Sequence, residues 1–232
     1  MQLFGEGLMI TFTEVAPDLE NEFNDWYNRE HLNERIDLPG FRRARRYEAI
    51  EAEIKYMSTY ECVAPSYIGS PTYLDVLSRP SEWSKKIMPQ FTKWHRMVAR
   101  VIADSSRGMG AYLALARFHP EPNLAQDTEA WLTNGILEDL SARTQLTGAS
   151  AIAVELKLDH RMTRAFGQEP DPMQIPEWGV LVEGTDPNAA LVAAQDALGN
   201  RMAELSSPGT APVFETWRFL YANQRLSDNE KA

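Results

Sequence analysis

The chain has 232 residues, of which 44% are hydrophobic and 24% charged, a composition typical of a globular protein with a substantial core. Its formal net charge of −10 argues against nucleic acid as a partner, because such binding needs clustered lysine and arginine side chains. The single cysteine, Cys62, excludes an intramolecular disulfide and a cysteine-based zinc site.

The first residues, MQLFGEGLMITF, lack the positive charge with which a signal peptide begins. No window of the sequence offers a run of apolar residues long enough to cross a bilayer. We therefore expect a cytoplasmic protein that does not associate with membranes.

Hydrophobic periodicity in the first half predicts the order β-α-β-β-α-β. A strand over 7–15 precedes a helix over 17–37, which begins at Pro17 and carries acidic residues in its first turn. A Leu-Pro-Gly turn ends this helix, and a second helical region is broken near Pro80 and Pro89. The remaining elements of this half are strands at 41–50 and 55–63, the helical region at 71–96 and a strand at 96–106.

The same order begins again after Gly108 and Gly110. The predicted elements are a strand at 111–118, a helix at 124–144, strands at 146–158 and 177–185, a helix at 188–206 and a strand at 214–224. A proline-rich insertion at 159–177 is too long for a plain hairpin, and its length is typical of a lid or an interface segment.

Local matches between the halves indicate an internal repeat. Trp26 falls opposite Trp131, the sequence LPGF opposite LTGA, residues 56–61 opposite 178–183, and Arg100 opposite Arg218. The β-α-β-β-α-β unit is the ferredoxin-like motif. We predict an α+β protein in which two tandem ferredoxin-like repeats, 1–108 and 109–232, pair their sheets face to face within one chain.

The tandem order and the segment WYNREHLNERIDLPGFRRARRY resemble the dimeric α+β barrel superfamily, specifically its EthD-like and polyketide-cyclase-like branches. The resemblance implies an intramolecular version of that barrel. It leaves the activity open, because the superfamily holds cyclases, isomerases, dehydratases, decarboxylases, cofactor-free monooxygenases and haem enzymes.

The first predicted helix concentrates titratable groups among aromatic ones. Helical spacing places six side chains on one face: Phe23, Trp26, Tyr27, Glu30, His31 and Glu34. We interpret His31 as a general acid or base, Glu30 as the carboxylate that orients it, and Tyr27 as a donor to an oxyanion. A carboxylate beside the imidazole would raise the pKa of His31, while desolvation would lower it. The imidazole is expected to face an enclosed hollow between the two sheets. The structural alternative is a core histidine bonded to a backbone carbonyl.

The second half lacks this equipment. The positions that match Tyr27, Glu30, His31 and Arg35 hold Leu132, Gly135, Ile136 and Leu140. We therefore predict one catalytic site per chain, in the first half.

Substrate-binding residues are predicted on the same helix and on neighbouring strands: Trp26, Arg35, Tyr60, Arg43 and Trp94. The strand FRRARRYE concentrates positive charge that would suit a carboxylate or phenolate. An exposed arginine face paired with Glu48, Glu51 and Glu53 is the favoured reading of that strand.

Metal and cofactor sites receive little support. Glu30, His31 and Glu34 have the i, i+3 spacing of a helical metal site, but no second such pair occurs in the sequence. Nothing singles out one of the other histidines, His95, His119 or His160, as a haem ligand. Nicotinamide, ATP, zinc-protease and α/β-hydrolase motifs are absent from the sequence. We expect no metal and no cofactor.

The leading functional hypothesis is a cofactor-independent lyase or isomerase that acts on a small aromatic or polyketide-like substrate by cyclisation, dehydration, decarboxylation or related fragment loss. The alternatives are a cofactor-free monooxygenase of the same fold and a non-catalytic barrel that binds small molecules in a stress response. Exposed helices leave room for a further homodimer.

Overall fold

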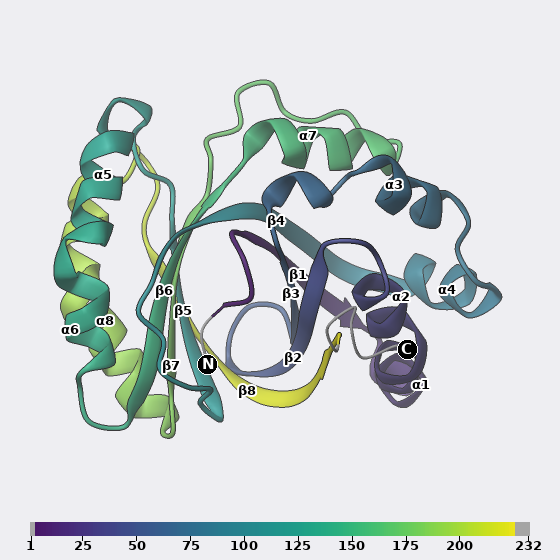
Figure 1. The fold of residues 1–232 in the computed structure, drawn as a ribbon, viewed down its shortest axis with the longest axis horizontal. Helices are drawn as coiled ribbons and strands as arrows, with labels where there is room; N and C mark the ends of the chain where they lie inside the picture. Colours follow the sequence, from purple (N-terminus) through teal and green to yellow (C-terminus); the bar gives the residue numbers. More distant parts are fainter. Residues whose placement is uncertain (1–2, 226–232) are drawn as a thin grey trace.

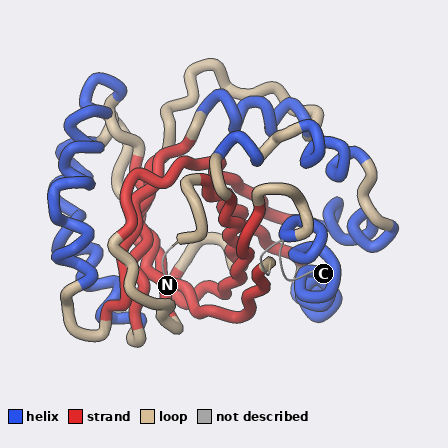
Figure 2. The backbone as a smooth tube through the Cα atoms, viewed as in Figure 1, coloured by secondary structure: helices blue, strands red, loops and turns tan. Residues whose placement is uncertain are grey.

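The computed structural model describes residues 3–225, in which eight antiparallel strands close into a barrel (Figures 1 and 2). The order around the barrel is β1-β3-β2-β8-β5-β7-β6-β4. The strands are β1 (Gly7–Val15), β2 (Phe41–Glu51), β3 (Tyr56–Cys62), β4 (Phe91–Asp104), β5 (Tyr112–Phe118), β6 (Leu146–Val154), β7 (Trp178–Gly184) and β8 (Val213–Gln224).

Each half of the chain contributes one ferredoxin-like sheet to this barrel. The first half runs β4-β1-β3-β2 and the second runs β8-β5-β7-β6. Pairing of β2 with β8 and of β4 with β6 joins the two sheets. The predicted fold class is therefore confirmed. The outer ends of the two predicted halves, residues 1–2 and 226–232, lie outside the described residues.

Strand register supports the internal repeat. Gly7 lies opposite Arg100 in the first half, and Tyr112 lies opposite Arg218 in the second. The expected match of LPGF with LTGA is wrong by three residues. The structural counterpart of Gly40 (φ 82°) is Gln145 (φ 67°), since each has a left-handed backbone directly before β2 or β6.

Helices cover the outer face of each sheet, as Figure 1 shows. The first half carries α1 (Glu20–Trp26), α2 (Leu32–Ile36), α3 (Pro71–Ser78) and α4 (Glu82–Ile87), while the second carries α5 (Ala125–Trp131), α6 (Leu137–Ser141), α7 (Leu156–Ala165) and α8 (Pro187–Leu205). Short 3₁₀ turns lie at Pro17–Leu19, Pro65–Tyr67, Met88–Gln90 and Pro122–Leu124.

Three hydrophobic clusters form the core. Two of them lie between a sheet and its helices, one in each half. The third takes side chains from all eight strands and fills the barrel interior: Leu8, Tyr47, Met57, Met97, Leu113, Ile152, Leu181 and Trp217 among others. Because these side chains fill the middle of the barrel, the expectation that His31 faces an enclosed hollow between the two sheets is wrong.

Two element boundaries differ from the predicted ones. The helical region ends at Gln90, because β4 pairs with β1 from Phe91 onward. The strand β6 ends at Val154, and the helix α7 takes the place of the end of the predicted strand and of the first part of the insertion. Met162 and Leu158 of α7 join the hydrophobic cluster of the first half, so tertiary packing favours a helix there. The helix therefore lies over the first half although it belongs to the second.

Candidate functional site

A wide helical turn positions the predicted histidine. Residues Tyr27–His31 form a π-type turn between α1 and α2, in which the amide of Leu32 donates to the carbonyl of Tyr27. Such turns insert an extra residue and rotate the side chains that follow. His31 consequently packs against Trp26, with ring centroids 4.3 Å apart, and against Tyr27 at 5.0 Å.

The imidazole of His31 is buried, and its pKa is shifted. Its exposed fraction is 9%, and its Nδ1 atom has no hydrogen-bond partner among the described residues. Burial lowers the pKa of His31 well below its usual value, and the positive charges of Arg35 and Arg46 lower it further. The ring is therefore neutral near pH 7 and can accept a proton. The structural alternative requires a hydrogen bond from the ring to a backbone carbonyl. Nδ1 makes no such bond in the described part of the chain.

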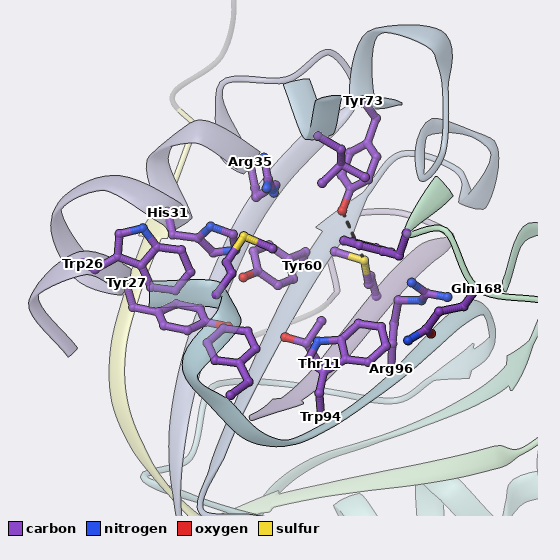
Figure 3. Close-up of a pocket in the computed structure, with 15 residues that line it drawn as sticks. Thr11, Trp26, Tyr27, His31, Arg35, Tyr60, Tyr73, Trp94, Arg96 and Gln168 are labelled. Carbon is purple, nitrogen blue, oxygen red and sulfur yellow. Dashed lines mark hydrogen bonds between the residues drawn. The ribbon is translucent and has the colours of Figure 1, made fainter. Parts of the chain in front are cut away.

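A cavity of about 290 Å³ opens beside this imidazole (Figure 3). It lies between the outer face of the first sheet and the helices, because Met9 and Thr11 line it while their neighbour Ile10 points into the barrel. The predicted residues Trp26, Tyr27, His31, Arg35, Tyr60 and Trp94 all line this cavity. Helix and strand residues that lie far apart in the sequence thus meet at one place.

Most of the cavity wall is apolar, yet several residues that line it hold a buried polar atom. Five of them have no hydrogen-bond partner in the described part of the chain: Thr11 Oγ1, His31 Nδ1, Arg35 Nη1, Tyr60 Oη and Arg96 Nη1. Buried polar groups normally find partners, and a group left without one costs free energy. Their concentration around one cavity is typical of a site that receives a polar ligand or ordered water.

Two guanidinium groups give the cavity a positive character. Arg35 is 5% exposed, stands over the ring of Tyr73 and lies 4.0 Å from the carboxylate of Glu34. Arg96 is 7% exposed and is anchored to α7. The described residues that line the cavity include no aspartate or glutamate, although Arg96 pairs with Asp159 of α7. An anion or a developing negative charge would therefore be stabilised there.

Tyr60 stands between these groups as a hydrogen-bond donor. Burial raises the pKa of its hydroxyl well above the usual value, and the nearby hydroxyl of Tyr27 adds to that effect. The phenol therefore stays protonated near pH 7. Figure 3 shows its ring between His31 on one side of the cavity and Arg96 on the other.

Glu30 does not line the cavity. Its carboxylate turns to the start of α4, where it accepts hydrogen bonds from Ser81 and, at 3.5 Å, from Ser84. The π-type turn accounts for this placement, because its extra residue brings His31 onto the face of Trp26, and Glu30, one residue earlier, points to a different side of the helix. The expectation that a neighbouring carboxylate raises the pKa of His31 is wrong. Glu30 instead reaches the site through Ser84, which accepts a hydrogen bond from the indole of Trp26 at 3.1 Å.

Arg43 also lies elsewhere. Its side chain is 1% exposed at one end of the barrel interior, where Nε and Nη2 donate to Glu61 at 2.8 and 2.9 Å. Arg45 bridges Glu61 and Glu183, the matching glutamates of the two halves. The favoured reading of an exposed arginine face is therefore wrong, because Arg43, Arg45 and Arg46 are all buried.

Arg46 points to the opposite side of the same strand and supports the aromatic helix. Its guanidinium stands 4.3 Å from the ring centre of Tyr27 and donates to the side chains of Asn24 and Asn28. The sequence did not single it out. Consecutive side chains of a strand point to opposite faces, so alternation could have placed Arg46 on the face that the first helix covers.

Other cavity residues were also missed: Thr11, Tyr73, Arg96, Phe166 and Gln168. Thr11 and Arg96 occupy outward positions of β1 and β4. The alternation of side chains along a strand predicts that they point out of the barrel, but not that a cavity lies beside them. Phe166 and Gln168 directly follow the end of α7, and Phe166 packs edge-to-face against Trp94 with ring centroids 5.7 Å apart. The second part of the insertion thereby forms the rim of the site.

The second half keeps the helical geometry without the chemistry. Its π-type turn, Leu132–Ile136, again follows a helix that ends in tryptophan, Trp131. Leu132 and Leu140, which match Tyr27 and Arg35, are fully buried in the hydrophobic cluster of that half. Gly135 leaves helical geometry with φ 91°.

Between residues 3 and 225, no three histidine, cysteine, aspartate or glutamate side chains gather as metal ligands would. No helix in that range combines the length and the apolar character that a bilayer crossing requires.

Comparison with known proteins gives likeness of fold. An anthrone oxidase-like protein superposes with a TM-score of 0.62 at 10% identity, covering 96% of this chain and 93% of its own. Two proteins described as "putative monooxygenase", from Fusobacterium nucleatum and Lactobacillus acidophilus, give TM-scores of 0.60 and 0.59 at 9% and 8% identity. They cover 96% and 94% of this chain, and 96% of each of their own chains.

The protein has the fold of the dimeric α+β barrel superfamily. No family model and no curated protein matches the sequence. In this barrel both ferredoxin-like units belong to one chain, and the candidate site belongs to the first of them.

Proposed function

We propose that the protein is a cofactor-independent enzyme that removes a proton from a small aromatic or polyketide-like carbon acid, with His31 as the general base. The observation that carries this proposal is the set of unpartnered polar atoms around one apolar cavity, which includes the imidazole, a protonated phenol and two guanidinium groups. A flat ring would lie against Trp26 and Phe91, which line the same cavity.

The chemistry follows from the charges. A neutral imidazole accepts the proton, and the anion that remains on the substrate gains hydrogen bonds from Arg35 and Tyr60. Tyr27, whose ring packs against His31, is proposed as a further donor. Glu30 is proposed to act indirectly. It binds Ser84, which binds the indole of Trp26, and the imidazole packs against that indole. Elimination, ring closure or migration of a double bond would then complete a lyase or isomerase reaction.

A second candidate is a cofactor-free monooxygenase, in which the substrate anion reacts directly with dioxygen. The names of the similar structures, anthrone oxidase-like protein and putative monooxygenase, favour this candidate. Both reactions share the first step. The third candidate is a small-molecule-binding barrel that performs no chemistry.

The test separates these candidates with 2-tetralone and anthrone as probes. Exchange of deuterium from D₂O into the probe is followed by NMR under argon. Without dioxygen, only the proton-abstraction step can be observed. We expect His31→Gln to lower the enzyme-dependent rate by about 10²-fold or more, and His119→Gln, a histidine outside this cavity, to leave it unchanged. Equal rates for the wild-type protein and His31→Gln would contradict the proposal.

Oxygen uptake in air then distinguishes the two enzymes. Uptake that depends on His31 identifies a monooxygenase. Product formation under argon without uptake identifies a lyase or isomerase. Binding of the probes with no exchange leaves the binding barrel.

A further inference from the structure

The end of the cavity that lies away from His31 is built around a second cation. Arg96 comes from an outward position of β4 and lines the cavity, and its buried Nη1 has no hydrogen-bond partner among the described residues. Figure 3 places it beside Gln168 and Trp94, opposite His31 and Arg35. A ligand that touches both ends would therefore meet a base at one end and a guanidinium at the other.

Neighbouring groups fix the orientation of Arg96. Its Nε donates to the carboxylate of Asp159 at 3.3 Å, and its Nη2 donates to the carbonyl of Asp159 and the hydroxyl of Thr163 at 3.1 and 2.9 Å. These bonds occupy Nε and Nη2 and leave Nη1 without a partner in the described part of the chain. Asp159 and Thr163 both belong to α7, so the insertion that forms the rim also aims this side chain.

The surroundings of Arg96 are aromatic. Its guanidinium carbon lies 5.1 Å from the ring centre of Trp94 and 5.6 Å from that of Phe166. A buried, oriented guanidinium with an unused donor is a preferred site for a carboxylate, and the two rings would hold the flat group to which the carboxylate is attached.

We propose that the substrate is an aromatic carboxylic acid, whose carboxylate binds Arg96 while its reactive end lies between His31 and Arg35. This inference deepens the proposed function and rests on it for the position of the reactive end. The carboxylate site itself rests on the geometry of Arg96 alone. A carboxylate bound in this cavity would also add negative charge near His31 and raise its basicity.

The test measures binding of 6-hydroxy-2-naphthoate, its neutral amide 6-hydroxy-2-naphthamide, and 2-naphthol by calorimetry at pH 7. We expect the wild-type protein to bind the carboxylate at least about 10-fold more tightly than the amide. In Arg96→Gln this ratio should fall to about 1, while 2-naphthol binding stays unchanged. Arg96→Lys, which retains a charge and contacts with α7, should keep part of the preference.

Arg100→Gln serves as the matched control, because Arg100 lies on the same strand and pairs with Glu129 and Glu155 outside the cavity. A wild-type ratio near 1, an unchanged ratio in Arg96→Gln, or no binding of any probe at millimolar concentration would overturn the carboxylate site. His31→Gln should keep the wild-type ratio. Loss of proton abstraction would therefore contradict the proposed function. A carboxylate-to-amide affinity ratio that does not depend on Arg96 would contradict only the carboxylate site.

Discussion

The imidazole of His31 packs against the indole of Trp26, with ring centroids 4.3 Å apart and planes inclined by 35°. The indole is held from behind by Ser84, and Ser84 by Glu30. The position of the proposed base is therefore set by a chain of contacts that ends at a carboxylate outside the cavity.

The acid limb of the pH profile should report His31. Because burial, Arg35 and Arg46 lower its pKa, the free enzyme should retain kcat/KM as pH falls through 6.5, and lose it only as the imidazole protonates at lower pH. Arg35→Gln removes one positive charge and should move this limb to higher pH. A wild-type limb above pH 6.5, or one that stays in place in Arg35→Gln, would contradict the assignment.

Stability should depend on the same group. The unfolded chain binds a proton at His31 below about pH 6.5 whereas the native protein does not, so native stability is lost as pH falls below that value. Between pH 7 and pH 5 the wild-type protein should lose as much as about 2 kcal/mol more than His31→Gln. Urea unfolding at both pH values measures the difference. Equal losses would show that the native imidazole titrates normally.

Tyr60→Phe should separate function from stability. The hydroxyl of Tyr60 is buried without a partner in the described structure, so its removal should leave the free energy of unfolding unchanged or raise it by about 0.5–1 kcal/mol. Turnover should fall because the substrate anion loses a donor. Tyr73→Phe is the matched control, since the Tyr73 hydroxyl donates to the sulfur of Met9. A marked loss of stability in Tyr60→Phe would mean that ordered water already satisfies the hydroxyl.

Ser84→Ala should loosen the indole behind His31. It leaves the buried Nε1–H of Trp26 without its acceptor and should cost about 1–3 kcal/mol of stability. Glu30→Gln keeps an oxygen that Ser81 and Ser84 can bond, and should cost less than Ser84→Ala. Chemical denaturation of both variants gives the comparison. The reverse order would place the main support of Trp26 elsewhere.

Glu61 should matter to the barrel far more than a surface glutamate does. Glu61→Gln removes a buried charge that pairs with Arg43 and Arg45, and should cost about 3–5 kcal/mol of unfolding free energy. Glu48→Gln breaks the exposed pair with Arg218 and should cost less than about 1 kcal/mol. Similar losses in the two variants would show that water reaches the end of the barrel.

The sequence by itself determined the order of elements, the internal repeat and the helical segment that lines the candidate site. Periodicity is a local property, so it located the strands and the helix with Trp26, Tyr27 and His31. Comparison of the two repeats identified Glu61 and Glu183 as counterparts, and the register of the strands bears this out, because Leu8 lies opposite Glu61 and Leu113 opposite Glu183.

Only the tertiary structure decided which side chains meet. The π-type turn brings His31, and not Glu30, onto the face of Trp26, and ideal helical spacing cannot anticipate an inserted residue. Arg43 is buried because barrel closure brings Glu61 to it, while Arg96 enters the site because α7 crosses from the second half to cover the first. Such contacts join residues far apart in the chain, and their strength depends on burial and orientation that only the closed barrel supplies.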